Sequence, residues 1–332
     1  MRQARITVPA EEGPGVYHAM TRTVNGERLF DDVAKEVLRK QLWQVADYCG
    51  AEIFTYTILT NHFHVLVRIP QRTEIPDVEL LRRYHVLYPK PTKYQCARLE
   101  VIRTQLTSNG PEAVVWRRRQ LELMGDLSQF MKLLKQRFSI WFNKSHRRYG
   151  TLWSERFKSV LIESNPVTLE TIAAYVDLNC VRAGLAEDPK DFRFCGYAEA
   201  VAGSSLARDG LAAVTGSAER SWSDVQADYR QLLFGTGAGP RDCGGSITSE
   251  EFQAVLRAGG NLPRATVLRC RIRYFTNGAV LGTRAFVATQ LARYRSRAGP
   301  CDRTAPRSLP QLTDWGDLTT LRKIREPAWS FR

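Results

Sequence analysis

The sequence predicts an α+β fold in which helices cover one face of an antiparallel sheet, followed by a small C-terminal domain. The main indication is the order of the periodic segments, which over the first 200 residues runs strand, helix, strand, strand, helix, strand, helix. The composition agrees, because 43% hydrophobic and 25% charged residues are typical of a folded soluble protein. A chain of 332 residues can form one large domain with appendages or two modest domains.

The first segments predict a β-α-β-β unit. Residues 33–49 have apolar side chains at helical spacing, with Asp31 or Asp32 placed to cap the start and Gly50 to end the helix. The expected strands are residues 16–22, 53–59 and 62–69, the last two joined by Thr60–Asn61.

The next segments complete the pattern after an insertion at about residues 71–120, which is polar and contains some helix. A strongly amphipathic helix is expected at 126–144, and an extended segment at 152–162. Asn165 and Pro166 then open another helix, because Asn is a preferred N-cap and Pro is favoured at the first helical position. Gly184 ends it.

The domains predicted from this pattern are a catalytic domain at 1–198, a linker region at 199–246 and a basic C-terminal domain at 247–332. The Gly-rich residues 235–245 indicate the linker. Within the C-terminal part, residues 269–275 alternate basic and apolar side chains, as a strand or arm on DNA would. An arginine-rich face at a domain junction is the alternative.

The net charge of +14 is concentrated in two stretches of one sign. Residues 128–160 contain eight Lys or Arg and one acid, and residues 264–297 contain eight Arg and no acid. A solubilising surface normally mixes the signs, so these stretches indicate a polyanionic partner, of which nucleic acid is favoured. Ribosomal association or an anionic membrane surface are the alternatives.

No stretch approaches the ~20 apolar residues of a membrane span, and the N-terminus lacks the apolar core of a signal peptide. The seven cysteines are scattered without a CxxC pair, which favours reduced thiols. We therefore expect a cytoplasmic protein without a membrane partner.

Two of the five histidines, His62 and His64, stand two positions apart in an apolar run. On a strand they point to the same side, while Phe63 and Val65 point to the other. Side-by-side imidazoles can ligate one metal ion. The alternative is a pair of partly buried polar residues with ordinary hydrogen-bond partners.

A second group of polar residues lies on the helix that starts at Asn165. Tyr175 and Asn179 are four residues apart and therefore share a face, with Arg182 nearly one turn further. Two imidazoles and one carboxamide oxygen would hold Mg²⁺ or Mn²⁺, with Mn²⁺ favoured by ligand softness, and leave positions open for a phosphate. A tyrosine hydroxyl needs such a cation to attack phosphorus effectively. Alternatively, Tyr175 is an aromatic residue at the edge of the core.

The motifs HFH and YVDLN resemble those of the HUH single-tyrosine transposases, and more closely the REP-associated tyrosine transposases, which are IS200-like. The flanking segments YHAMTRT, GTLWSERFKS and YVDLNCVRAG are similar too, in the right order over about residues 15–200. Two departures are the long insertion and Cys180, where the family's asparagine motif is expected to have Pro.

The resemblance implies a ferredoxin-like catalytic core that cleaves and rejoins single-stranded DNA next to a hairpin. It implies that His62, His64 and Asn179 are metal ligands and that Tyr175 is the nucleophile, forming a 5′-phosphotyrosine. Glu163 and Asp177 are less favoured ligands. The candidates for DNA contact, chosen by charge and placement, are Arg22, Arg147, Arg148, Arg156, Lys158 and Arg182. Trp153 and Phe157 either stack on bases or, as we favour, belong to the core.

The predicted function is therefore that of a metal-dependent single-stranded DNA transposase or nickase. The alternative is a protein of the same fold that binds hairpin DNA without needing catalysis. A third hypothesis is a hydrolase of small phosphoesters, but this function would leave Tyr175 and the basic stretches unexplained. We expect a bacterial, nucleoid-associated protein, and a monomer rather than a homodimer.

Overall fold

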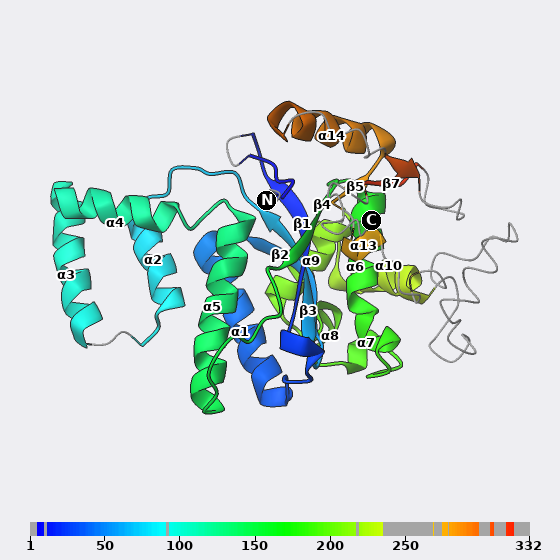
Figure 1. Cartoon of the computed structure of the whole chain (residues 1–332), viewed down its shortest axis with the longest axis horizontal. Helices are drawn as coiled ribbons and strands as arrows, with labels where there is room; N and C mark the ends of the chain where they lie inside the picture. Colours follow the sequence, from blue (N-terminus) through cyan, green and yellow to red (C-terminus); the bar gives the residue numbers. More distant parts are fainter. Residues whose placement is uncertain are drawn as a thin grey trace, which may run out of the picture.

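The computed structural model describes residues 5–9, 12–90, 93–216, 219–234, 268, 274–277, 279–298, 306–308 and 317–321. Within these residues the predicted α+β class is confirmed. A mixed seven-stranded sheet in the order β2-β3-β1-β4-β5-β7-β6 forms the centre, and helices lie on both of its faces (Figure 1).

The first half of the sheet is the expected ferredoxin-like core. Strands β2, β3, β1 and β4 are neighbours in that order, and each neighbouring pair is antiparallel. Helices α1 and α5 lie together on one face of this core, as predicted (Figure 1). The elements of the core are β1 (Gly15–Arg22), α1 (Asp32–Cys49), β2 (Glu52–Ile58), β3 (His62–Ile69), α5 (Leu127–Ser145) and β4 (Lys158–Ile162).

Local side-chain chemistry sets the ends of the core helices. The Asp31 carboxylate accepts a hydrogen bond from the Ala34 N–H at 2.7 Å, which caps α1. Gly50 ends the helix with a φ of 66°, a left-handed conformation that favours glycine. Asp126 caps α5 in the same way, accepting from Gln129 N at 2.8 Å. The predicted starts of both helices are confirmed to within one residue.

Aromatic side chains fill the space between this face of the sheet and α5. Phe30 lies edge-on to Phe138 at 5.4 Å and to Trp153 at 5.8 Å between ring centroids. Phe63 of β3 contacts Trp153 from the sheet. All four side chains are buried, so this face consists of densely packed hydrophobic core. Trp153 therefore belongs to the core, as favoured from the sequence.

The insertion after β3 is a unit of three helices that projects away from the sheet (Figure 1). Its helices are α2 (Asp77–Leu87), α3 (Lys93–Ser108) and α4 (Pro111–Leu121). Contacts with α1 attach the unit to the core; among them, the Tyr48 hydroxyl donates to Gln120, and Arg82 forms an ion pair with Asp47.

Later helices cover the second face of the core, whereas the sequence predicted helices on one face only. They are α6 (Pro166–Asp177), α7 (Asn179–Arg182), α8 (Gly196–Val201), α9 (Ser205–Val214) and α10 (Trp222–Phe234). The helix predicted to start at Asn165 is present, as α6 and α7. The described part of the region expected to be a linker is thus helical. Gly210 lets α9 lie against β2, because a Cβ at this position would meet the Ile53 carbonyl oxygen at 2.3 Å.

A buried carboxylate, Asp177, joins these helices to the sheet. It accepts hydrogen bonds from Thr55 of β2 at 2.7 Å and from the Tyr229 hydroxyl of α10 at 2.6 Å. The Tyr197 N–H of α8 is a third donor at 3.3 Å. Complete burial raises the pKa of Asp177 to about 7, against the effect of the three donors.

The described C-terminal residues continue the same sheet. Strand β5 (Val280–Gly282) pairs with β4 in parallel, and β7 (Thr319–Leu321) and β6 (Arg307–Ser308) extend the sheet antiparallel to their neighbours. Helix α13 (Tyr274–Asn277) precedes β5, and α14 (Arg284–Ala298) follows it. Of the basic strand or arm expected at residues 269–275, residues 269–273 lie outside the described residues, and Tyr274 and Phe275 belong to helix α13 rather than to an extended segment. The Gly-rich segment 235–245 also lies outside the described residues, and the domain boundaries remain a prediction.

Across the part of the chain that the structure describes, no helix combines the length and the apolar composition needed to cross a membrane.

Asp177→Asn is expected to flatten the dependence of stability on pH. The folded protein holds the Asp177 proton with a pKa of about 7, whereas the unfolded chain releases it near 3.8. The folded state therefore binds more protons, and stability falls by about 2–3 kcal/mol as the pH rises from 5 to 8. Urea unfolding at several pH values measures this slope. The exposed Asp209→Asn should keep the wild-type slope, and an unchanged slope in Asp177→Asn would contradict the assignment.

Candidate active site

The register of β1 against β3 gathers the polar residues of the site on one face of the sheet. Arg22 pairs with His62, and Met20 pairs with His64, so these side chains share a face that also carries His18. On the other side of β1, Lys158 of β4 pairs with Met20. Two cationic residues thus flank the predicted metal ligands at one end of the sheet.

His62 is held by a neighbouring asparagine. The Asn61 amide donates through Nδ2 to the Gly26 carbonyl at 2.9 Å, so its Oδ1 faces the His62 ring. His62 Nδ1 lies 2.6 Å from that oxygen and therefore carries a proton. This leaves Nε2 as the nitrogen of His62 that can ligate a metal.

His64 is held by a residue that the sequence did not single out, His18. The Nε2 atom of His18 is 2.9 Å from Nδ1 of His64, and the two rings stack at 5.1 Å between centroids. His18 Nδ1 in turn donates to the Phe275 carbonyl at 2.7 Å. Burial lowers the pKa of His18 to about 4 and that of His64 well below its usual range. Both rings are therefore neutral near pH 7.

Tyr175 reaches this face from α6. Asn165 caps the helix by accepting from Thr168 N at 2.9 Å, and Pro166 is its first residue. The Tyr175 ring lies edge-on to both histidines, 6.4 Å from His64 and 6.1 Å from His18 between centroids. The predicted convergence of the phenol with the histidine pair is thus present in the fold.

Asn179 begins the short helix α7, directly after α6. Its Nδ2 donates to the carbonyls of Tyr175 and Val176, each at 3.1 Å. Because Nδ2 makes both hydrogen bonds that the structure shows for this side chain, Oδ1 is the atom that can serve as a ligand.

The donor set fits a divalent metal ion. Both imidazoles are fixed through Nδ1 by other residues, and metal-ligating histidines are typically held in this way through the nitrogen that does not bind metal. In the described part of the chain, no three His, Cys, Asp or Glu side chains are arranged so that they could hold a metal ion together. The two histidines therefore need Asn179 to complete a set of three ligands.

The less favoured ligands point elsewhere. Glu163 accepts hydrogen bonds from the backbone N–H and the hydroxyl of Thr283, at the start of α14. Asp177 is bonded to β2, α8 and α10, as described above.

Tyr175 is covered in this structure. The residue is 1% exposed, and the Phe275 ring lies edge-on to it at 4.9 Å. The Arg182 guanidinium lies 4.0 Å from the centre of the phenol ring and donates to the carbonyls of Tyr175 and Leu268. These contacts position the tyrosine and its cover. The predicted DNA contact of Arg182 has no support from them.

The other predicted DNA contacts are on or near the surface. Arg147 and Arg156 are exposed, and Arg148 lies 3.7 Å from the Glu27 carboxylate. Lys158 is exposed and forms an ion pair with Glu155 at 3.3 Å. Their roles remain predictions. Phe157 is buried beneath the Arg5 guanidinium, 3.7 Å from its ring centre, which is a core position.

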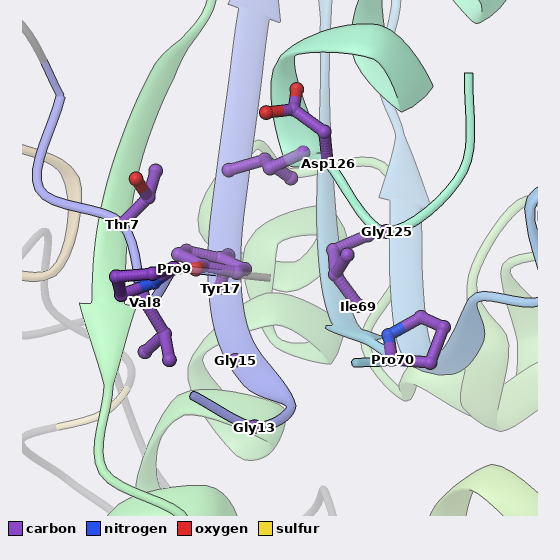
Figure 2. A pocket seen from close by; sticks show the side chains of 11 residues that line it. Thr7, Val8, Pro9, Gly13, Gly15, Tyr17, Ile69, Pro70, Gly125 and Asp126 are labelled. Carbon is purple, nitrogen blue, oxygen red and sulfur yellow. Dashed lines mark hydrogen bonds between the residues drawn. The ribbon is translucent and has the colours of Figure 1, made fainter. Parts of the chain in front are cut away.

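A separate pocket lies at the opposite end of β1 and β3 (Figure 2). Gly15, Tyr17, Ile69 and Pro70 are among its lining residues, and Val8 N donates to the Tyr17 hydroxyl at 2.9 Å. Histidine is absent from its lining, so it is distinct from the site described here.

The fold and the site together define a class of protein: a ferredoxin-like core with a histidine pair on a central strand, a tyrosine facing the pair from α6, and an asparagine four residues after the tyrosine. Residues 15–82, from β1 into the first part of α2, match the family described as "Transposase IS200 like", in agreement with the IS200-like resemblance of the motifs in this part of the chain.

Among solved structures, the chain is similar to one described as "Structure of the REP associates tyrosine transposase bound to a REP hairpin". The likeness has a TM-score of 0.38 and 13% identity, and covers 62% of this chain and 88% of that one. At this TM-score and identity, the likeness gives no support to a family or a function for this chain. No curated protein matches the chain.

Arg182→Lys is expected to destabilise the protein by about 1–3 kcal/mol. Lysine cannot donate to two carbonyls while stacking on the Tyr175 ring. Hydrogen exchange should also quicken in the peptides around Tyr175 and Phe275. Urea unfolding and exchange mass spectrometry measure both effects. The exposed Arg193→Lys is the matched control, expected to stay within about 0.5 kcal/mol. Equal stability and equal hydrogen exchange in the two variants would show that Arg182 does not position Tyr175.

Proposed function

We propose that the protein is a metal-dependent transposase or nickase of single-stranded DNA, cleaving and rejoining strands next to a hairpin through Tyr175. The observation that carries the proposal is the convergence of Tyr175 with the histidine pair. The Tyr175 ring lies 6.4 Å from that of His64, with His62 beside it on β3 and Asn179 one helical turn beyond Tyr175. The IS200-like match of residues 15–82 supports the same class.

The reaction would be a pair of transesterifications. The Tyr175 oxygen attacks the scissile phosphorus and loses its proton to solvent. A bond between phosphorus and the tyrosine oxygen forms as the bond to the 3′ oxygen breaks, and a 3′-OH is released. Rejoining is the reverse attack by a 3′-OH on the 5′-phosphotyrosine, which frees the tyrosine. The divalent ion, when bound, would polarise the phosphate and hold it in line.

Charge near the site supports an anionic substrate. Arg22 ends β1 beside His62, and Lys158 starts β4 on the same face of the sheet. The nearby acids Glu163 and Asp177 bond to other elements. A phosphate at the metal would therefore lie near Arg22 and near Lys158, whose ion pair with Glu155 it would compete with.

The cover on Tyr175 sets a condition for catalysis. With Phe275 against the phenol ring and Tyr175 buried, a phosphate reaches the nucleophile only after Phe275 has moved. The second candidate function is that of a hairpin-DNA-binding protein of the same fold that does not need to cleave DNA. The burial of Tyr175 favours it, because a buried hydroxyl cannot attack a phosphate.

We further propose that the protein works as a monomer in the bacterial cytoplasm. The two histidines, the tyrosine and the asparagine all come from one chain, so no helix of a partner is needed to complete the site. Light scattering of the protein with hairpin DNA measures the subunit number.

Tyr175→Phe is expected to abolish the covalent protein–DNA adduct while sparing DNA binding, since only the attacking oxygen is removed. A labelled hairpin with a single-stranded flank is incubated with Mn²⁺ or with EDTA. The adduct is separated on a denaturing gel, and binding is measured in EDTA. Tyr94→Phe, which changes an exposed tyrosine of the insertion, should form adduct at the wild-type level. An adduct of full yield in Tyr175→Phe would rule out this nucleophile, and binding without any adduct in the wild type would support the binding-protein alternative.

Arg22→Ala and Lys158→Ala are each expected to weaken binding of the single-stranded flank and to reduce its salt dependence. Losing one phosphate contact lowers the slope of log K against log salt by about 0.7–1. Fluorescence anisotropy at several salt concentrations measures the slope. Lys40→Ala, on α1 at the other face of the sheet, should leave the slope unchanged. Wild-type slopes in both site variants would exclude these residues from the DNA path.

A further inference from the structure

A line of hydrogen bonds connects the C-terminal segment to a predicted metal ligand. It runs from the Phe275 carbonyl of α13 to Nδ1 of His18 on β1, at 2.7 Å, and from Nε2 of His18 to Nδ1 of His64 on β3, at 2.9 Å. Both rings are fully or almost fully buried. Three segments that are far apart in the sequence thus meet at two imidazoles.

The chemistry of the three partners decides where each proton lies. A carbonyl oxygen only accepts hydrogen bonds, so Nδ1 of His18 carries a proton. A neutral imidazole has one N–H, so Nε2 of His18 is a bare acceptor. The bond of 2.9 Å then requires the proton of His64 to lie on Nδ1. The remaining nitrogen of His64, Nε2, carries a lone pair.

We propose that the Phe275 carbonyl, acting through His18, fixes His64 as the Nδ1-protonated tautomer and so presents its Nε2 lone pair to a divalent cation. His18 is in this view a positioning residue for the metal ligand. The inference rests on the proposed function, in which His64 binds the metal.

The arrangement matches what a metal-ligating histidine requires. The ring must be neutral, its metal-facing nitrogen must lack a proton, and its orientation must be fixed by a partner on the opposite nitrogen. His62 has a comparable partner in Asn61, whose Oδ1 accepts from Nδ1 and so fixes the orientation of the ring. Both predicted histidine ligands are thus protonated on Nδ1, and both offer Nε2. The two holding residues differ, but the nitrogen left for the metal is the same.

The relay also gives the C-terminal segment a part in metal binding. Phe275 contributes its ring to the cover on Tyr175 and its carbonyl to the histidine pair. Displacing this segment would remove the acceptor that orders His18. Phe275 therefore holds both the histidine pair and the ring contact that buries Tyr175.

The first test reads the tautomers in the metal-free, full-length protein. Ring-nitrogen NMR of protein labelled with ¹⁵N-histidine distinguishes protonated from bare nitrogens. His18 and His64 are both expected to be protonated on Nδ1. A proton on Nε2 of His64 would overturn the proposal, and this result does not depend on any metal binding.

The second test measures Mn²⁺ affinity in two variants of His18. His18→Leu removes the acceptor for His64 and is expected to weaken Mn²⁺ binding about 10–100-fold. His18→Gln keeps an oxygen that can accept from His64 and a nitrogen that can donate to Phe275, and is expected to restore most of the affinity. His85→Leu, in the insertion, removes a distant histidine and should bind as the wild type does.

The outcomes separate this inference from the proposed function. If the wild type binds Mn²⁺ and His18→Leu binds equally well, His18 has no positioning role and the inference fails. If the wild type binds no Mn²⁺ but shows the expected tautomers, the relay stands and the metal-dependent function fails. Should His18→Leu not fold, His18→Gln and the NMR of the wild type still decide the question.

Discussion

The antiparallel register of β1 with β3 is the constraint on which the site depends. It places Arg22 beside His62 and Met20 beside His64, and it brings His18 within hydrogen-bond reach of His64. Side chains alternate along a strand, so a slip of one residue would turn the histidines of one strand into the aromatic core. The hydrophobic face of β3 prevents that slip, because Phe63 is buried against Trp153. Packing on one side of the sheet therefore fixes the chemistry on the other.

The two faces of the sheet divide these tasks. The face under α1 and α5 is aromatic and apolar, and the face under α6 contains several buried polar groups. Two of them join α6 to β2: Thr57 donates to the Val176 carbonyl at 2.7 Å, and Asp177 accepts from Thr55 and Tyr229. A buried polar group without a partner costs stability, so these bonds fix α6 to β2 in one position. Tyr175 and Asn179 are placed by the same contacts.

The C-terminal segment is integrated into this arrangement. Strand β5 pairs with β4, so α13 is held at the edge of the core with Phe275 against Tyr175. Arg182 connects the same parts, since its guanidinium contacts Tyr175 and donates to the Leu268 carbonyl. The burial of Tyr175 and the order of the histidine pair therefore depend on one short piece of chain. Such an arrangement can hold a reactive site closed until a partner displaces the cover.

The sequence by itself determined the parts that local backbone geometry controls. Period-two alternation put His62 and His64 on one side of a strand, helical spacing put Tyr175 and Asn179 together, and Asp31 and Asn165 marked helix starts. Only the tertiary structure revealed His18 as a partner of His64, the Phe275 cover, the carbonyl contacts of Arg182 and the helices at 199–234 on the second face. These contacts join residues up to 257 positions apart. Local periodicity fixes which way a side chain points along its own element, but the partner it meets depends on how distant elements pair and pack.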